Sequence, residues 1–197
     1  MYRVLRIVFI SLVLSSTSFA TSTIGNFGQV TGLVYRGERL NDEPDYQELA
    51  RLGVKTIINL ESLFEDDQKI CSKYGISCTR FPIPLRGFPE LDKNFDYKML
   101  EKAFQFLIDE NSRNKKVYIH CHYGSDRTGA LVSAVTIRLN YCENKENYNA
   151  DAAWDKVQSD LRTYNYHDFL YKKLKKNIKL WTYTPPDWIC THPTQSE

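Results

Sequence analysis

One short segment places a cysteine and an arginine at a spacing that suits the binding of a phosphate group. Residues 118–129 read Tyr-Ile-His-Cys-His-Tyr-Gly-Ser-Asp-Arg-Thr-Gly, so Arg127 lies six positions after Cys121. The apolar residues before Cys121 predict a short buried strand, and the apolar run 130–139 predicts a helix after the loop. A loop between a strand end and a helix N-terminus directs several backbone N–H groups at one point, where the helix dipole adds positive charge. Residues 121–127 therefore predict an anion-binding loop, which we call the cradle.

Cys121 and Arg127 are the residues predicted to react with and hold the bound group. The helix N-terminus and the nearby guanidinium stabilise a thiolate relative to a thiol, so Cys121 is a predicted nucleophile. Arg127 supplies a planar fork that fits two phosphate oxygens and keeps its charge. Gly124 permits the tight turn of the loop, and Thr128 could donate its hydroxyl to the sulfur. Four cradle residues are predicted to contact the substrate: His122, Tyr123, Gly124 and Ser125.

These residues resemble the signature of the cysteine-dependent protein tyrosine phosphatase superfamily. Its His-Cys pair, five intervening residues, arginine and Ser or Thr match His120, Cys121, Arg127 and Thr128. The resemblance implies a phosphocysteine intermediate that water hydrolyses, and it implies no metal or organic cofactor. Two weaker alternatives are a structural cysteine in a strand–helix turn and a zinc site. The zinc site would need neighbouring strand side chains, which point to opposite faces.

The proton donor for the leaving group is the open part of this resemblance. Members of the superfamily often supply an aspartate from a loop that precedes the helix before the cradle. In this chain the corresponding loop is 82–92, where Asp92 and Glu90 are candidates, although Asp92 could equally cap the following helix. Asp126 is a second candidate, because Asp-Arg-Thr is similar to the loop of myotubularin-like and Sac-type phosphoinositide phosphatases. Alternatively, Asp126 pairs with a neighbouring base or loop amide and holds the cradle together.

The substrate class follows only from the resemblance. Within the superfamily the chain resembles the secreted phosphatase-like inositol polyphosphatases of the phytase branch, which implies an inositol polyphosphate substrate. A ring dense with phosphates needs cations around the pocket. The candidates are Arg36, Arg39 and Arg80, together with the predicted substrate contacts Arg86 and Lys93. His122 could add charge in acidic solution.

Two other functions remain open. Tyr123 suits an aromatic ester as well, so a protein phosphotyrosine or dual-specificity phosphatase is the alternative enzyme. From a different class, the chain could be an inactive phosphate-binding module. The intact Cys121 and Arg127 argue against the inactive module.

The segments around the cradle predict an α/β fold with a central, mostly parallel sheet flanked by helices and with a helical C-terminal half. Strands are predicted at 30–35, 54–60, 76–83 and 117–119, alternating with helices at 44–52, 64–73 and 99–108. Further helices are predicted at 130–141, 150–164 and 168–181. From about residue 30 to 180 this order resembles the compact dual-specificity phosphatase domain, with the cradle after the fourth or fifth strand.

Length and the N-terminal pattern predict one exported domain. The chain has 197 residues, of which 42% are hydrophobic, which suits a single globular core. Arg3 and Arg6 precede the apolar run 7–14, and Ser18-Phe19-Ala20 resembles a cleavage site, so residues 1–20 are a predicted signal peptide. A lead-in at 21–29, a phosphatase domain at 30–181 and a tail at 182–197 follow, with regular structure ending at Pro185-Pro186. We expect a periplasmic or secreted protein without stable membrane insertion.

The charge balance limits the partners. Without Arg3 and Arg6 the mature chain has 24 basic and 24 acidic residues, so no nucleic-acid partner is expected. The lysines of 172–179 are predicted to form a solvated face over an apolar stripe. The expected protein is a monomer that acts on a phosphorylated small molecule, such as an inositol phosphate, or on a phosphoprotein.

Five cysteines in an exported chain raise the question of disulfides. If Cys121 must stay free, four cysteines remain, and Cys71 and Cys78 are the favoured pair because they are close in sequence. The four cysteines Cys71, Cys78, Cys142 and Cys190 allow three full pairings, among which the sequence does not choose, and they could instead be buried free thiols. Alternatively, Cys78 could protect Cys121 through a reversible disulfide.

Overall fold

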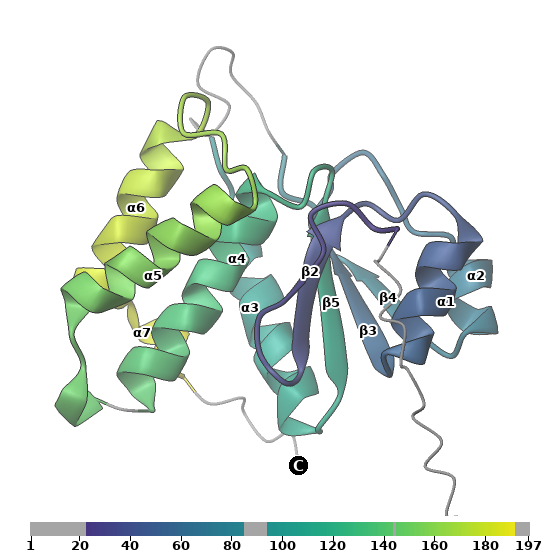
Figure 1. The fold of residues 1–197 in the computed structure, drawn as a ribbon, viewed down its shortest axis with the longest axis horizontal. Coiled ribbons are helices and arrows are strands. Elements are labelled where there is room, and N and C mark those ends of the chain that lie inside the picture. Colours follow the sequence, from purple (N-terminus) through teal and green to yellow (C-terminus); the bar gives the residue numbers. More distant parts are fainter. Residues whose placement is uncertain (1–22, 85–93, 144, 192–197) are drawn as a thin grey trace, which may run out of the picture.

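A single five-stranded sheet forms the centre of the protein (Figure 1). The computed structural model describes residues 23–84, 94–143 and 145–191. The strand order is β1-β2-β5-β3-β4, from β1 (Gly28–Gln29), β2 (Val34–Glu38), β3 (Val54–Asn59), β4 (Ser77–Arg80) and β5 (Lys116–Cys121). Only β1 pairs antiparallel; the pairs β2–β5, β5–β3 and β3–β4 are parallel. The predicted, mostly parallel α/β sheet is confirmed, and the cradle follows the fifth strand.

Helices cover both faces of the sheet (Figure 1). One face carries α1 (Glu43–Arg51) and α2 (Gln68–Lys73). The other carries α3 (Tyr97–Ser112), α4 (Asp126–Ile137), α5 (Ala150–Thr163), α6 (Lys172–Tyr183) and α7 (Asp187–Cys190). A π turn, η1 (Arg138–Cys142), continues α4, and a 3-10 turn, η2 (Lys145–Asn147), precedes α5. The side chains of β5 alternate between the two layers, because Ile119 and Cys121 belong to the larger core and Tyr118 to the smaller one.

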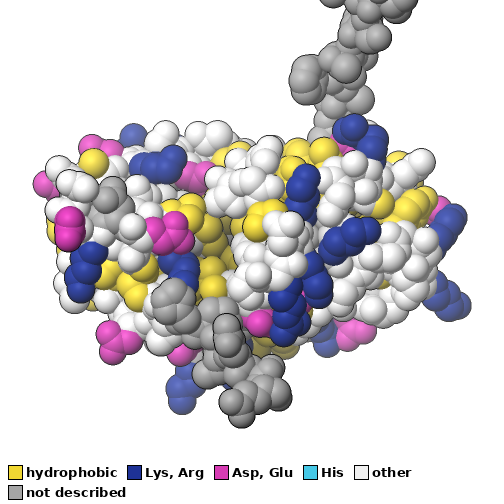
Figure 2. Space-filling view, turned by 90° about the horizontal axis from the view of Figure 1, so that it is seen from below, with side chains coloured by type: hydrophobic (Ala, Val, Ile, Leu, Met, Phe, Trp, Pro, Cys, Tyr) yellow, Lys and Arg dark blue, Asp and Glu magenta, His cyan; other side chains and the backbone are white. Residues whose placement is uncertain are grey.

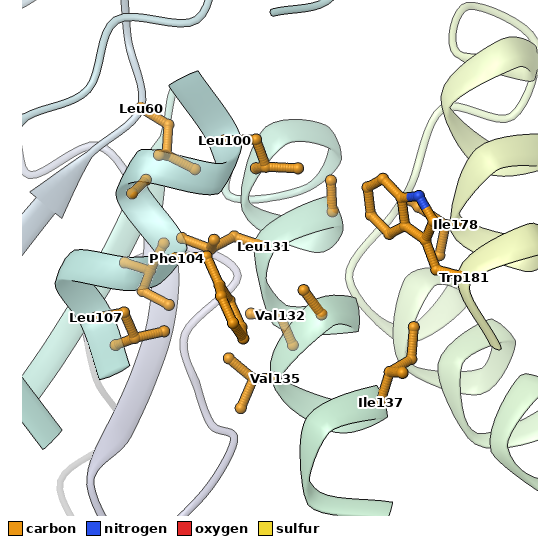
Figure 3. Packing of buried hydrophobic residues seen from close by; sticks show 14 of the residues in the cluster. Leu60, Leu100, Phe104, Leu107, Leu131, Val132, Val135, Ile137, Ile178 and Trp181 are labelled. Atoms are coloured by element: carbon orange, nitrogen blue, oxygen red, sulfur yellow. The ribbon is translucent and has the colours of Figure 1, made fainter. Parts of the chain in front are cut away.

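The helix that leaves the cradle is buried along its whole length. Every residue of α4 is buried. Figure 3 shows Leu131 and Val132 of α4 facing Phe104 of α3, while Trp181 of α6 lies on the other side of the helix. Because apolar burial contributes roughly 25 cal/mol per Å², packing on several sides fixes α4. The position of the cradle is therefore set by the core.

Three elements begin later than the sequence predicts. β2 starts at Val34, since Val30 and its neighbours form a turn in which the Val30 N–H donates to the Val34 carbonyl at 2.8 Å. The helix predicted from residue 64 starts at Gln68, where the side chain of Asp67 accepts the first N–H groups. α6 begins at Lys172 instead of residue 168.

The core extends beyond the predicted end of the domain. Regular structure continues after Pro186, which precedes α7 as its N-cap. Proline fits this place because the first turn of a helix does not need its N–H group. Ile189 of α7 is fully buried in the larger core. The prediction that a tail begins at residue 182 is therefore wrong as far as Thr191.

Four of the five cysteines form disulfides. Cys71 pairs with Cys78, as predicted, and Cys142 pairs with Cys190. Cys121 is free and buried. The alternative in which Cys78 protects Cys121 does not hold in this structure, because the sulfur of Cys78 is already bonded to Cys71.

The surface carries both signs of charge. Figure 2 shows basic and acidic side chains interspersed with apolar ones on the face seen from below. On α6 the predicted solvated face is confirmed, since Lys173 and Lys176 are exposed while Leu174 and Ile178 are buried. No helix within the described residues combines the length and hydropathy needed to span a bilayer. The predicted signal peptide lies outside these residues, as do Arg86, Glu90, Asp92 and Lys93.

Candidate active site

The cradle lies where β5 meets α4, with Cys121 as the last residue of the strand. Cys121 is buried, and it is 3% exposed. Gly124 has φ +64, and a Cβ atom there would lie 2.3 Å from the carbonyl carbon of Gly37 in β2. The loop therefore packs directly on the neighbouring strand, which only a glycine permits. The sequence prediction of a tight turn at Gly124 is confirmed.

Among the described contacts, hydrogen bonds from one nitrogen hold the Arg127 guanidinium in place. Its Nη1 donates to the carbonyl of Leu60 and to that of Ile83, both at 3.2 Å. Arginine has five N–H donors, so Nε and Nη2 keep the pair of donors that matches two phosphate oxygens. Arg127 also lines the pocket together with Cys121. The geometry agrees with the predicted role of Arg127 as the phosphate fork.

The hydroxyl groups of Thr128 and Ser125 make few hydrogen bonds with the described residues. The Thr128 hydroxyl is buried without a hydrogen-bond partner among the described residues, so the predicted bond to Cys121 is absent here. A buried hydroxyl without an acceptor costs about 1–3 kcal/mol, which makes it a ready donor to an anion in the cradle. Ser125 is buried, and its hydroxyl donates to the Tyr123 carbonyl at 3.4 Å.

His120 is fixed beneath the cradle by a buried carboxylate. Its Nε2 lies 3.2 Å from Oδ1 of Asp66, and both side chains are buried. Burial alone would raise the pKa of Asp66, but the hydrogen bond and charge of His120, with help from Asn59 and Tyr46, hold that pKa below its usual value. The pair positions the residue before Cys121.

Arg36 lies under the cradle and not at the pocket rim, where the sequence analysis expected it. Its side chain is fully buried, and its Nη2 donates to the Gly124 carbonyl at 2.8 Å. Its Nη1 donates to Asp160 of α5, and its guanidinium stacks 3.9 Å above the ring of Tyr164. Arg36 therefore holds the loop through the Gly124 carbonyl and is not among the residues that line the pocket.

A pocket of about 360 Å³ opens over Cys121. Of the other predicted rim cations, Arg39 lines it, but its Nε and Nη2 both donate to the carboxylate of Glu61. Arg80 pairs with Glu65 at the surface and is not among the lining residues. The predicted contacts His122 and Tyr123 do line the pocket. Of the three predicted cations that the structure describes, Arg36, Arg39 and Arg80, only Arg39 therefore lines the pocket.

Asp126 pairs with a residue that the sequence analysis did not single out. Its Oδ1 accepts the backbone N–H of His167 at 2.8 Å, and its Oδ2 lies 2.9 Å from His167 Nδ1. Burial raises the pKa of Asp126, and the contacts from His167 and the charge of Arg127 offset this only in part. This geometry agrees with the alternative in which Asp126 holds the site together. Its role as proton donor stays a prediction, as does that of Asp92.

The residues that sequence reasoning missed come from distant segments. Glu61, Asp66 and His167 carry no local motif, and their contacts with the site form only in the folded chain. For Glu61 and Asp66 one signal was available, because both follow the end of a predicted buried strand, where ligands of parallel sheets bind. Within the described ranges, no group of three or more His, Cys, Asp or Glu side chains is arranged to hold a metal ion.

Comparison with known proteins places these features in a family. Residues 32–140 match the family model described as "Polymorphic toxin system, DSP-PTPase phosphatase". The inositol diphosphatase DSP5 of Arabidopsis thaliana is 28% identical over 75% of this chain and 72% of its own length. The inositol diphosphatase DSP4 of the same plant is 28% identical over 84% of this chain and 79% of its own length.

Solved structures share the fold. The catalytic domain of the phosphatase SIW14 from S. cerevisiae has a TM-score of 0.56 at 20% identity, covering 83% of this chain and 87% of that one. P. aeruginosa TpbA has a TM-score of 0.53 at 19% identity, covering 84% and 94%. Because the family model spans more than half of the chain and includes the cradle, the chain belongs to the DSP-PTPase phosphatase family and is a cysteine-dependent phosphatase.

Proposed function

We propose that this protein hydrolyses phosphate groups of inositol polyphosphates through a phosphocysteine intermediate. The Cys121 thiolate attacks phosphorus, so that a P–S bond forms while the P–O bond to the leaving group breaks and the leaving oxygen takes a proton. Water then attacks the phosphocysteine, the P–S bond breaks, and inorganic phosphate and the thiolate are released. Arg127 and the backbone N–H groups of the cradle hold the phosphate oxygens during both steps.

The observation that carries the chemistry is the placement of Cys121 and Arg127 in one pocket. The two carbonyl contacts of Arg127 use Nη1, so among the described residues Nε and Nη2 are left to bind the phosphate. The choice of substrate is supported by the relatives DSP5 and DSP4, which are named inositol diphosphatases. A pocket of about 360 Å³ lies in the range of small-molecule sites.

A panel of phosphate-release assays tests the proposal. The panel compares inositol hexakisphosphate, a diphosphoinositol polyphosphate, a phosphotyrosine peptide and para-nitrophenyl phosphate. We expect the highest kcat/KM on one of the two inositol compounds. A clear preference for the phosphopeptide would replace the proposed substrate with a phosphotyrosine protein.

Two variants test the chemistry independently of the substrate. Cys121→Ser should abolish turnover on every substrate while the protein still binds phosphate, because the cradle amides and Arg127 remain. Arg127→Lys should lose about 100-fold or more in kcat, since lysine cannot span two oxygens. Residual activity of Cys121→Ser within tenfold of the wild type would contradict the phosphocysteine intermediate.

We further propose that the protein is exported and acts as a monomer. The two disulfides support export, because such bonds persist mainly in oxidising compartments. Expressed in a bacterial host with its own N-terminus, the protein should be found in the periplasm without residues 1–20. Mass spectrometry of a soluble product that still begins with Met1 would contradict export.

A further inference from the structure

The loop that follows α5 is fastened to the cradle and forms one wall of the pocket. The side chain of Asn165 donates to that of Asn26 at 3.1 Å, and Asn26 donates in turn to the Tyr123 carbonyl at 2.7 Å. Tyr164, one residue earlier, stacks on the buried Arg36. The next part of the loop includes His167, which lines the pocket together with Cys121. His167 is therefore presented to the pocket by a loop held at several points.

Asp126 fixes the orientation of the His167 ring. One carboxylate oxygen holds the backbone of His167 and the other holds Nδ1, so both the position and the rotation of the ring are set. Nε2 is then the ring nitrogen left to meet a ligand. The His167 side chain is 43% exposed, whereas that of Asp126 is 8% exposed. Asp126 acts as the buried support and His167 as the accessible group.

The described pocket is close to electrically balanced when its histidines are neutral. Arg39 is matched by Glu61, and Arg127 has Asp126 next to it in the first turn of α4. The cradle amides can bind one phosphate, but the described walls offer no uncompensated cation to a second one. The remaining lining groups that can gain positive charge are His122 and His167.

Both histidine rings lie next to the exposed ring of Tyr123. The ring centroids of His122 and Tyr123 are 4.2 Å apart, and those of Tyr123 and His167 are 6.0 Å apart. Nδ1 of His122 lies 3.8 Å from Oε2 of Glu61, so each imidazole has a carboxylate behind it.

We propose that His167, oriented by Asp126, forms with His122 a subsite that binds a second phosphate group when the two imidazoles are protonated. The ligand is a small molecule with at least two phosphates, one in the cradle and one at the histidines. The inference rests on the proposed function for this substrate class. His167 is a substrate-binding residue in this scheme, and Asp126 is a positioning residue.

Both histidines face a defined set of charged and titratable groups. Glu61 and the ring of Tyr123 lie next to His122, and Asp126 and the ring of Tyr123 lie next to His167. The other charged or titratable groups that line the same pocket are Arg39, Cys121, Arg127 and Tyr171. Asp168, next to His167 in the chain, is paired with Lys175 of α6. As the pH falls from 7.5 to 5.5, an ordinary histidine gains its charge whereas carboxylates largely keep theirs. The affinity for the second phosphate should therefore rise on acidification.

Binding to the inactive Cys121→Ser protein tests the subsite without turnover. Calorimetry compares inositol hexakisphosphate with inorganic phosphate at pH 5.5 and 7.5, with and without His167→Gln. For each ligand and pH, the dissociation constant of the His167→Gln protein is divided by that of its parent. This ratio is used because protonation of the ligand affects both proteins equally. We expect His167→Gln to weaken hexakisphosphate binding about tenfold or more at pH 5.5 and less than threefold at pH 7.5. The effect on inorganic phosphate should be much smaller.

Two further variants separate charge from folding. His167→Lys keeps a positive charge at both pH values, so it should bind the hexakisphosphate well at pH 5.5 and better than its parent at pH 7.5. Lys173→Gln removes one charge from an exposed site on α6 outside the pocket and should leave both ligands unaffected. Equal weakening of both ligands by His167→Gln, or a His167→Lys protein as weak as His167→Gln, overturns the subsite.

The outcome for the subsite can be told apart from that for the substrate. Hydrolysis of inositol hexakisphosphate without the pH-dependent ratio would overturn the subsite and leave the proposed function intact. The expected ratio without hydrolysis would support the subsite and overturn the proposed substrate.

Discussion

Replacing Arg36 should separate the stability of the fold from the position of the cradle. Burial lowers the pKa of Arg36, and burial also raises the pKa of its partner Asp160. For both Arg36 and Asp160, desolvation therefore changes the pKa more than the attraction between the two charges does. A pair of this kind adds little net stability compared with apolar side chains of similar size. Its contribution lies in the hydrogen bond from Arg36 to the Gly124 carbonyl.

The expected magnitude follows from the contacts that are lost. In Arg36→Met, Asp160 becomes an unpaired carboxylate, which costs about 3 kcal/mol because its side chain is still 27% exposed. Loss of the donor to Gly124 and of the stacking on Tyr164 adds about 1 kcal/mol. For a chain of this length, about 4 kcal/mol lowers Tm by roughly 8–16 °C. Differential scanning calorimetry measures the shift.

A double variant separates the two roles. In Arg36→Met/Asp160→Leu no charge is left unpaired, so most of the lost stability should return. The Gly124 carbonyl still lacks its donor, and we expect kcat/KM on para-nitrophenyl phosphate to remain at least about tenfold below the wild type. The matched control is Arg80→Met, which breaks a surface pair with Glu65 and should change stability by less than about 1 kcal/mol. Full recovery of activity in the double variant would refute the positioning role of Arg36.

Three other predictions concern the disulfides, the proton donor and the pH dependence of stability. Replacing both Cys142 and Cys190 by alanine should cost about 2–5 kcal/mol in free energy of unfolding, because α7 loses its covalent link to η1; urea unfolding with an unchanged midpoint would contradict this. If Asp92 donates the proton, Asp92→Asn should lower kcat about 10²–10⁴-fold on inositol phosphates and spare activated aryl phosphates, whereas Asp126→Asn should show this selectivity if that residue is the donor. Equal losses on both substrate types in either variant would assign that residue to holding the site. Because the folded-state pKa of Asp66 is lowered, its contribution to stability is present above about pH 4 and is lost as the pH falls through the folded pKa, so Asp66→Asn should flatten the acid side of the Tm profile.

The sequence predicted the parts of the site that are contiguous in the chain. The cradle from Cys121 to Arg127 could be found because a strand, a turn and a helix N-terminus each have a local pattern. Its place was predicted as after the fourth or fifth strand, and the structure has the fifth because the two-residue β1, which is too short to show an alternation, precedes β2. The positions of Arg36 and His167 were not predictable in this way, because their contacts join residues 88 and 41 positions apart. A periodicity identifies a strand but does not identify its neighbour in the sheet.

The error at the C-terminus has a similar origin. α6 ends at Tyr183, shortly before Pro185 and Pro186, because proline cannot continue a helix. The same residues can precede a new helix, and the four-residue α7 is too short to show a period. What holds α7 in place is Ile189 in the core and the disulfide of Cys190, both of them tertiary contacts. Propensity alone therefore could not distinguish a tail from a docked helix.

The arrangement of charges indicates where selectivity among phosphorylated substrates resides. The Cys121 nucleophile and the Arg127 fork recognise a phosphate group and nothing beyond it, so they serve any phosphate ester that reaches them. The other side chains that line the pocket come largely from distant segments, among them Arg39, Glu61 and His167. His167 is hydrogen-bonded to Asp126, and the Arg39 backbone N–H donates to the His122 carbonyl at 3.4 Å. Both residues are nevertheless far from residues 121–127 in sequence, so they can change without altering the reaction. Selectivity for one phosphorylated compound over another should therefore follow substitutions at these pocket-lining residues, whereas substitutions of Cys121 or Arg127 should change the rate on all substrates alike.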